Sequence, residues 1–185
     1  NNSHALPLDL SAPVALFGRV KKNYFYVGNG SGGDVSAPYN INLVQGLVNA
    51  GVQLDSTVLA AYESWCTASV NDPDPGFWGH WPRYYAEMPV KQDWVQAAAK
   101  RCQTAVVVIG RSAGEDRENT LKKGSFYLTN KEKALLDAVT TAFQKVVLVL
   151  NIGSIMDFAE IDAYGDKISA ILLAWQLGME SGNAV

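Results

Sequence analysis

The stretch Thr104-Ala-Val-Val-Val-Ile-Gly110 decides the fold class of this chain. Its apolar part is rich in valine, is too short for a buried helix and ends at a glycine, so it predicts a β-strand. A second run, residues 146–152, has the same composition and is followed by Gly153. Apolar runs without polar alternation are typical of strands that are buried on both faces. We therefore expect a parallel sheet that is covered by helices.

The segments around these two strands complete an alternating pattern. Two further apolar runs, residues 13–17 and 168–175, extend the expected sheet to four strands. Helical spacing of apolar residues lies between the strands, and Thr129-x-x-Glu132 predicts a helix that begins with a capping box. Alternating strands and helices predict an α/β fold, a three-layer α/β/α sandwich of the doubly wound, flavodoxin-like kind with a mostly parallel sheet. Residues 182–185 have the pattern of a beginning helix, so we expect the sandwich to be truncated at its C-terminal end.

Composition excludes several classes of function. With 185 residues, of which 48% are apolar, the chain is long enough for one domain with its own core. A net charge of −3 argues against nucleic acid or an anionic membrane as a partner. Cys66 and Cys102 lack metal-site spacing and are expected to be core thiols, and two histidines, His4 and His80, are too few for a zinc site. We expect no metal and no cofactor, which leaves carboxylate chemistry. The compartment stays open.

The loop after the strand at 104–109 concentrates ionisable groups among small residues. In an open parallel sheet, ligands bind where the loops gather at the carboxyl ends of the strands. The segment Arg111-Ser-Ala-Gly-Glu-Asp-Arg-Glu-Asn119 lies at such an end. Its small residues let a substrate approach, and its carboxylates supply proton transfer. From composition alone, a solvated charged loop is the favoured interpretation of this segment, and it stays the favoured one for Asp116 and Glu118.

A glycine-rich loop offers a second class of function. Gly28-Asn-Gly-Ser-Gly-Gly33 fits the dinucleotide fingerprint G-x-G-x-x-G, and Asp55 follows at a suitable distance. The fingerprint works only if its third glycine opens a helix, whereas Pro38 interrupts helix propagation here. A nucleotide- or small-ligand-binding regulatory domain is therefore the alternative function. A flexible turn, or a loop that lets a sugar or a neighbouring domain come close, explains the glycines as well.

Read together, these motifs resemble the α/β-sandwich domain of glycoside hydrolase family 3, the family of many β-glucosidases. The resemblance covers nearly the whole chain except an aromatic insertion at residues 71–89. It rests on an ordered series of segments: a linker at 2–8, a first strand at 14–18, the glycine loop at 28–33, a strand and acid/base loop at 106–117, the segment 126–135, a strand at 146–153 and the closing segment 171–185.

The resemblance implies a division of the chain and an activity. Residues 1–12 correspond to a linker and residues 13–185 to the sandwich domain. Family members hydrolyse terminal β-linked glucose or related sugars with retention of configuration, and their aspartate nucleophile lies on a (β/α)8 barrel domain that is absent from this chain. The acid/base glutamate of the family matches Glu115. We therefore expect the chain alone to be inactive, with a carbohydrate substrate and the barrel domain of the same polypeptide as its partners. Sugar, linkage, domain order and oligomeric state stay open.

Other residues carry weaker expectations. Ser31 is a candidate to bind a sugar hydroxyl, with a plain turn as the alternative, and Arg111 is a candidate sugar ligand, with ion pairing as the alternative. Trp78 and Trp81 are candidates to stack on a pyranose ring or to pack against the barrel, and we expect them to be exposed. Without a nucleophile nearby, Glu115 itself is expected to be exposed and to titrate like an ordinary glutamate.

Overall fold

The sheet has the parallel arrangement that the valine-rich runs predict. The structure is a computed structural model that describes residues 4–33, 36–68, 71 and 76–185. Its strands are β1 (Val14–Phe17), β2 (Thr104–Arg111), β3 (Lys145–Ile152) and β4 (Ala170–Leu173). All neighbours pair in parallel in the order β1-β2-β3-β4. The expected fourth strand is shorter than residues 168–175.

A single bridge gives the sheet its doubly wound topology. Leu54 pairs in parallel with Val14, on the edge of β1 that β2 does not use, because the Val14 amide donates to Gln53 and the Asp55 amide donates back to Val14. The chain thus passes to one side of β1 at Leu54 and returns on the other side at β2. In such folds, ligands bind where the direction of winding reverses, which here lies between β1 and β2.

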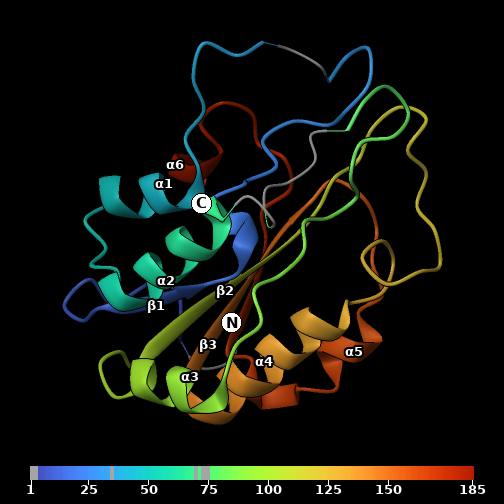
Figure 1. The fold of residues 1–185 in the computed structure, drawn as a ribbon. Helices are drawn as coiled ribbons and strands as arrows, with labels where there is room; N and C mark the ends of the chain where they lie inside the picture. Colours follow the sequence, from blue (N-terminus) through green and yellow to red (C-terminus); the bar gives the residue numbers. More distant parts are fainter. Residues whose placement is uncertain (1–3, 34–35, 69–70, 72–75) are drawn as a thin grey trace.

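Helices cover both faces of the sheet (Figure 1). One core contains the inward residues of α2 (Ser56–Thr67), α3 (Gln92–Ala99), α4 (Asn130–Ala142) and α5 (Ala159–Asp162). The other contains residues of α1 (Leu43–Asn49), and α6 (Ser181–Ala184) packs beside α1. Short 3-10 helices at Arg19–Lys21 and Gly165–Lys167 complete the elements. The three-layer sandwich is therefore confirmed.

The local signals for α4 and for the cysteines are also confirmed. The Thr129 side chain accepts from the Glu132 amide at 3.2 Å, and the Glu132 carboxylate accepts from the Thr129 amide at 2.7 Å, which is the predicted capping box. Cys66 and Cys102 are buried and free. Within the described ranges, no helix is long and apolar enough to cross a membrane.

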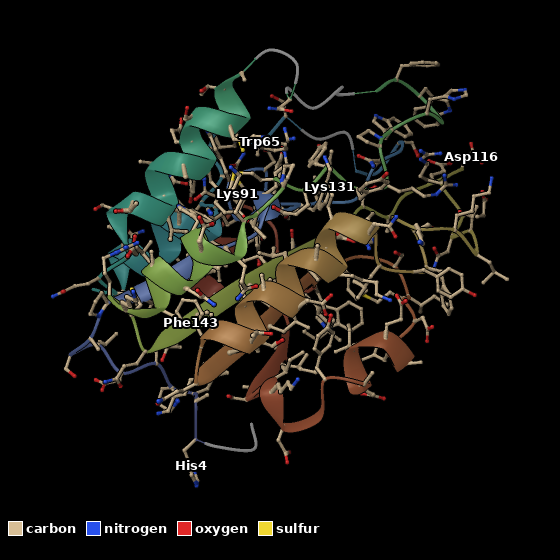
Figure 2. All side chains as sticks on the ribbon, turned by 60° about the horizontal axis from the view of Figure 1, so that its bottom comes forward. His4, Trp65, Lys91, Asp116, Lys131 and Phe143 are labelled. Carbon is tan, nitrogen blue, oxygen red and sulfur yellow. The ribbon has the colours of Figure 1, made fainter. Side chains whose placement is uncertain are left out.

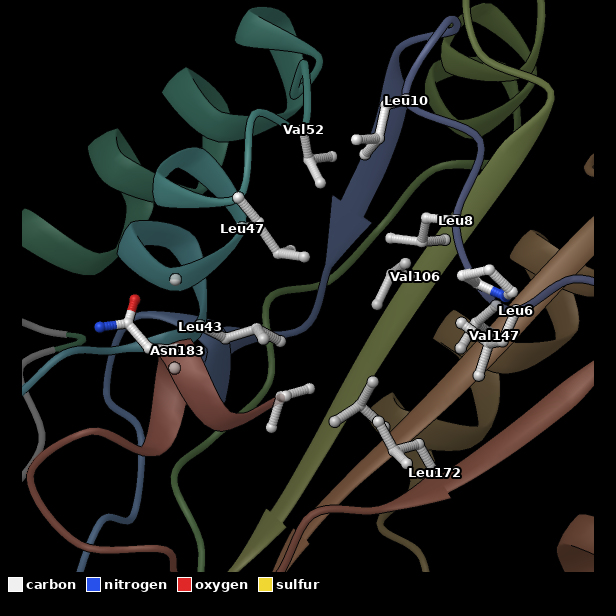
Figure 3. A pocket seen from close by; sticks show the side chains of 16 residues that line it. Leu6, Leu8, Leu10, Leu43, Leu47, Val52, Val106, Val147, Leu172 and Asn183 are labelled. Carbon is white, nitrogen blue, oxygen red and sulfur yellow. The ribbon is translucent and has the colours of Figure 1, made fainter.

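The second face of the sheet holds an apolar pocket of about 290 Å³ (Figure 3). Leu6 and Leu8, from the segment expected to be a linker, pack against this face together with the buried Ala5. Leu43 and Leu47 of α1 close the pocket from another side. It lies over the middle of the strands, so it is remote from the loops at their carboxyl ends.

Candidate active site at the carboxyl ends of β1 and β2

The loops that follow β1 and β2 are joined by backbone hydrogen bonds. They lie in the cluster of loops at the top of Figure 1. The Asn29 amide donates to the Ala113 carbonyl at 2.8 Å, and the Glu115 amide donates to the Asn29 carbonyl at 3.1 Å. Asn29 and Gly114 therefore form a short parallel bridge. This contact continues the β1–β2 pairing beyond the strands and brings Glu115 to the reversal point of the sheet.

Two glycines permit this close approach. Gly30 has φ +107°, a conformation that other residues rarely adopt, and a Cβ there would lie 2.5 Å from the Cβ of Glu115. A Cβ on Gly114 would lie 2.3 Å from the carbonyl oxygen of Asn29. The glycine-rich loop therefore packs directly against the backbone of the loop that carries Glu115.

Glu115 is exposed, as expected, but it does not titrate as expected. Its Oε2 accepts hydrogen bonds from the Ser31 hydroxyl at 2.6 Å and from the Ser31 amide at 2.9 Å. Both donors stabilise the ionised form, so the hydroxyl first and then the amide lower the pKa of Glu115. The expectation of an ordinary glutamate was wrong because Ser31, which lies 84 positions away in the sequence, provides a partner.

The other two carboxylates of the loop differ from Glu115. Asp116, which is labelled at the right of Figure 2, and Glu118 are both exposed. Within the described residues, neither carboxylate has a hydrogen-bond or ion-pair partner. Asp116 has φ +54°, so the backbone turns directly after Glu115. Glu115 is thus the carboxylate of this loop that the fold holds in a defined orientation.

The structure corrects the prediction for Arg111 as a sugar ligand. Arg111 is completely buried, and its guanidinium makes a bidentate ion pair with Glu132 at 2.7 and 2.9 Å. Its remaining donors bond to backbone carbonyls of Gly110, Ser125 and Tyr127. Every N–H of the guanidinium is therefore used inside the domain, and the alternative of an ion pair is the correct one.

The aromatic insertion packs beside the Glu115 loop. Ser112 binds it twice, because its amide donates to the Arg83 carbonyl at 2.8 Å and its hydroxyl donates to the Pro82 carbonyl at 2.6 Å. Trp78 is 52% exposed, as expected, whereas Trp81 is half-buried, and the two rings meet edge to face at 5.2 Å. Part of the insertion, residues 72–75, lies outside the described residues.

Sequence reasoning missed the residue that ties these loops together. Asn151, buried at the end of β3, donates to the carbonyls of Phe25 and Trp175 and accepts from the Phe25 amide, at 2.6 to 2.7 Å. It therefore fixes the loops after β1 and β4 to β3. The available signal was an amide side chain inside an otherwise apolar run, because a buried polar group requires partners.

The nucleotide alternative depends on a helix that the described residues do not provide. The chain turns at residues 31–33, and α1 begins only at Leu43. Asp55, the acidic residue that follows the fingerprint at a suitable distance, caps α2 and pairs with Arg101 at 2.6 Å. Within the described residues, no group of three or more histidine, cysteine or acidic side chains is placed to hold a metal.

Comparison with known proteins gives a consistent result. The model of the glycosyl hydrolase family 3 C-terminal domain matches residues 1–185. A beta-glucosidase of Ruminococcus albus is 39% identical over 98% of this chain, which spans 19% of that protein. A solved beta-glucosidase of Paenibacillus barengoltzii superimposes with a TM-score of 0.92 at 33% identity, over 100% of this chain and 20% of its own. Beta-glucosidase 3B of Thermotoga neapolitana, solved in complex with glucose, gives 0.84 at 30% identity, over 98% of this chain and 26% of its own.

These matches cover the whole of this chain and about a quarter or less of each relative. The fold, the order of the motifs and the family model agree along the full sequence. The chain belongs to glycosyl hydrolase family 3 and corresponds to its C-terminal domain.

Proposed function

We propose that this domain supplies Glu115 as the general acid/base of a retaining β-glucosidase whose nucleophile lies on a barrel domain outside this chain. One observation carries the proposal: Glu115 is an exposed carboxylate that is held by Ser31 at the reversal point between β1 and β2. The names of the relatives support β-linked glucose as the substrate class.

Glu115 has two tasks in this reaction. In the first step, its carboxylic acid protonates the glycosidic oxygen while an aspartate of the barrel attacks the anomeric carbon, which gives a glycosyl-enzyme and releases the aglycone. In the second step, the Glu115 carboxylate removes a proton from water, which attacks the anomeric carbon and frees the sugar and the aspartate. Glu115 ends protonated and is ready for the next substrate.

The bond to Ser31 opposes the first task. It lowers the pKa of Glu115, whereas a general acid near neutral pH needs a raised pKa. A nearby nucleophile carboxylate and the exclusion of water would both raise it. We therefore infer that the Ser31 contact belongs to the open site, and that a bound sugar takes over the Ser31 hydroxyl.

The aromatic insertion supplies the other sugar contact in this proposal. Trp78 is half-exposed and meets the ring of Trp81, whose backbone carbonyl accepts from Arg117 of the loop that carries Glu115. Aromatic faces suit the apolar face of a pyranose, so Trp78 stacks on the sugar unit that leaves.

The domain by itself is expected to be inactive. A retaining mechanism needs a second carboxylate about 5–5.5 Å from the first, across the bond that breaks. Purified residues 1–185 should not hydrolyse an aryl β-glucoside above the background rate. Turnover that is lost on a point change within this chain would place the nucleophile here and refute the proposed division of labour.

Exchange of Glu115 in the full-length enzyme tests the proposal. Glu115→Ala should lower kcat/KM for an unactivated disaccharide by about 10²–10⁴-fold, and should affect an activated aryl glucoside less, because a good leaving group needs little protonation. Added azide should restore turnover of the aryl glucoside. Glu118→Ala, three residues away on the same exposed loop, is the control and should stay near wild type. Normal disaccharide hydrolysis by Glu115→Ala would move the role to another carboxylate.

A further inference from the structure

A basic pocket of about 370 Å³ opens beside the aromatic insertion, apart from the carboxylate of Glu115. It lies between residues 82–86 of the insertion and residues 117–125, which follow the Glu115 loop. Four cationic side chains line it, and no acidic residue does: Arg83, Arg117, Lys122 and Lys123.

These four cations have no carboxylate partner. The ion pairs among the described residues join other groups, and Asp116 and Glu118, which flank Arg117 in the sequence, pair with none of the four. Lys123 donates to the neutral amide oxygen of Asn130 at 2.6 Å. Within the described part of the chain, the cations of the pocket are therefore not engaged in ion pairs.

The two arginines are held close together in spite of their like charge. Arg83 donates through Nε and Nη2 to the Glu118 carbonyl at 3.2 and 2.9 Å, and Arg117 donates through Nε to the Trp81 carbonyl. Both are half-buried, and burial first and the charge of Arg83 second lower the pKa of Arg117. Because the fold already holds both arginine side chains in place, an anion that binds them does not have to order them first. The free-energy cost of binding is therefore smaller, and the site is preorganised.

The wall of the pocket is rigid as well. The ring of Tyr84 packs against Gly124, where an added Cβ would lie 2.1 Å from a ring carbon, and Gly124 has φ +81°. The buried guanidinium of Arg111 lies 5.9 Å from the centre of the same ring. The cations therefore line a hollow with one packed wall, which suits a small ligand better than a flat protein surface.

We propose that Arg83, Arg117, Lys122 and Lys123 form a binding site for a small oxyanion, either free phosphate or the charged group of an acidic or phosphorylated sugar. Guanidinium and ammonium groups bind phosphate and carboxylate oxygens through short, charge-assisted hydrogen bonds. The inference does not depend on the role of Glu115, because it concerns binding and not hydrolysis.

Calorimetric titration of the full-length protein with inorganic phosphate, in a buffer without other oxyanions, tests the site. Saturable one-to-one binding is expected, and in Lys122→Gln/Lys123→Gln the Kd should rise about tenfold. The control, Lys91→Gln/Lys100→Gln, removes two exposed lysines at the ends of α3 and should leave the Kd unchanged. Both positions of the test variant are exposed, so its fold should persist, and circular dichroism checks this.

Titrations with glucose 6-phosphate, glucuronate and glucose separate the two sources of the anion. A charged sugar that binds more tightly than phosphate identifies a sugar ligand, and equal affinity identifies the free anion; both results support the site. Absence of saturable binding, equal weakening in the test and control variants, or an unchanged Kd for phosphate in Lys122→Gln/Lys123→Gln would overturn it. Binding lost without any change in hydrolysis of a neutral glucoside would leave the function of Glu115 untouched.

Discussion

Two carboxylates bind partners near the end of β2, and they differ in almost every physical respect. Glu132 holds Arg111 in a bidentate ion pair where both side chains are at least 95% buried. Glu115, four positions after Arg111, holds only the hydroxyl and amide of Ser31 and is exposed. The first carboxylate has all its capacity committed to the fold, whereas the second remains open to a ligand. Burial therefore separates the carboxylate that serves the fold from the carboxylate that we propose for catalysis.

Glu132 has a second structural role besides its ion pair with Arg111. It also closes the capping box of α4 by accepting from the Thr129 amide, so one side chain joins β2 to the start of a helix. The Glu115 side chain has no such structural role. Backbone hydrogen bonds, which the close approach at Gly30 and Gly114 permits, already hold its loop in place. Loss of each carboxylate should thus have opposite consequences for stability and for activity.

The largest effect is expected for Glu132→Ala. It leaves the Arg111 guanidinium buried without a counter-charge and removes a cap, so the free energy of unfolding should fall by about 3–5 kcal/mol. Glu115→Ala is the matched control and should leave it close to that of the wild type, because an exposed side chain far from the core contributes little. Denaturant unfolding of both variants measures the difference.

Glu132→Gln sharpens this result. Glutamine still closes a capping box, so this variant separates the charge from the cap. If the unpaired charge of Arg111 causes most of the loss, Glu132→Gln should lower the free energy of unfolding nearly as much as Glu132→Ala does. A loss in Glu115→Ala equal to that in Glu132→Ala would contradict the contrast between the two carboxylates.

The same contrast applies to two tryptophans. Trp94 packs against the core, edge to face with Phe17 at 5.7 Å, whereas Trp78 is half-exposed. Trp94→Ala should cost about 3 kcal/mol of stability. Trp78→Ala should cost less than about 0.5 kcal/mol and should instead raise KM for a disaccharide in the full-length enzyme. An unchanged KM would assign Trp78 to another surface function.

The sequence predicts the layers of the fold because their signals are local. Valine-rich runs that end in glycine gave β2 and β3, and Thr129 with Glu132 gave the start of α4. The C-terminal edge was less well predicted, because residues on both sides of β4 are apolar while only Ala170–Leu173 pairs with β3. Hydrophobicity alone does not mark where pairing ends.

The site was predictable only in part. Glu115 follows a recognisable strand, so its place in the loop after β2 could be predicted from the sequence, whereas its catalytic role stays a prediction. Arg111 was misassigned because β2 continues through it, and the strand alternation that directs its side chain toward Glu132 is visible only once the end of the strand is known. The Ser31–Glu115 bond spans 84 positions, and no local pattern encodes such a contact.

The smallest effect is expected for Ser31→Ala, which tests how Glu115 is held. Two donors from Ser31 lower the pKa of Glu115, and the variant removes the hydroxyl, the larger cause, so this pKa should rise toward its ordinary value. A carboxyl group whose pKa is lower in the folded state contributes stability above its unfolded pKa and loses it as the pH falls through the folded pKa. Ser31→Ala should thus lose this small contribution to stability at neutral pH, and its stability should approach that of the wild type as the pH falls below the folded pKa of Glu115.

Carboxyl-detected NMR titration measures this pKa directly, and the chain contains a matched control. Ser11 donates to Asp9 through its hydroxyl at 2.6 Å and its amide at 2.9 Å, and it lowers the pKa of Asp9 in the same way. Ser11→Ala should raise the pKa of Asp9 and leave that of Glu115 unchanged, while Ser31→Ala should do the reverse. If the pKa of Glu115 does not respond to Ser31→Ala, the hydroxyl does not hold the carboxylate in solution. Glu115 would then have no fixed orientation, like Asp116. The proposal that a bound sugar takes the Ser31 hydroxyl from Glu115 would then fail, because the hydroxyl would not be bound to Glu115 at the outset.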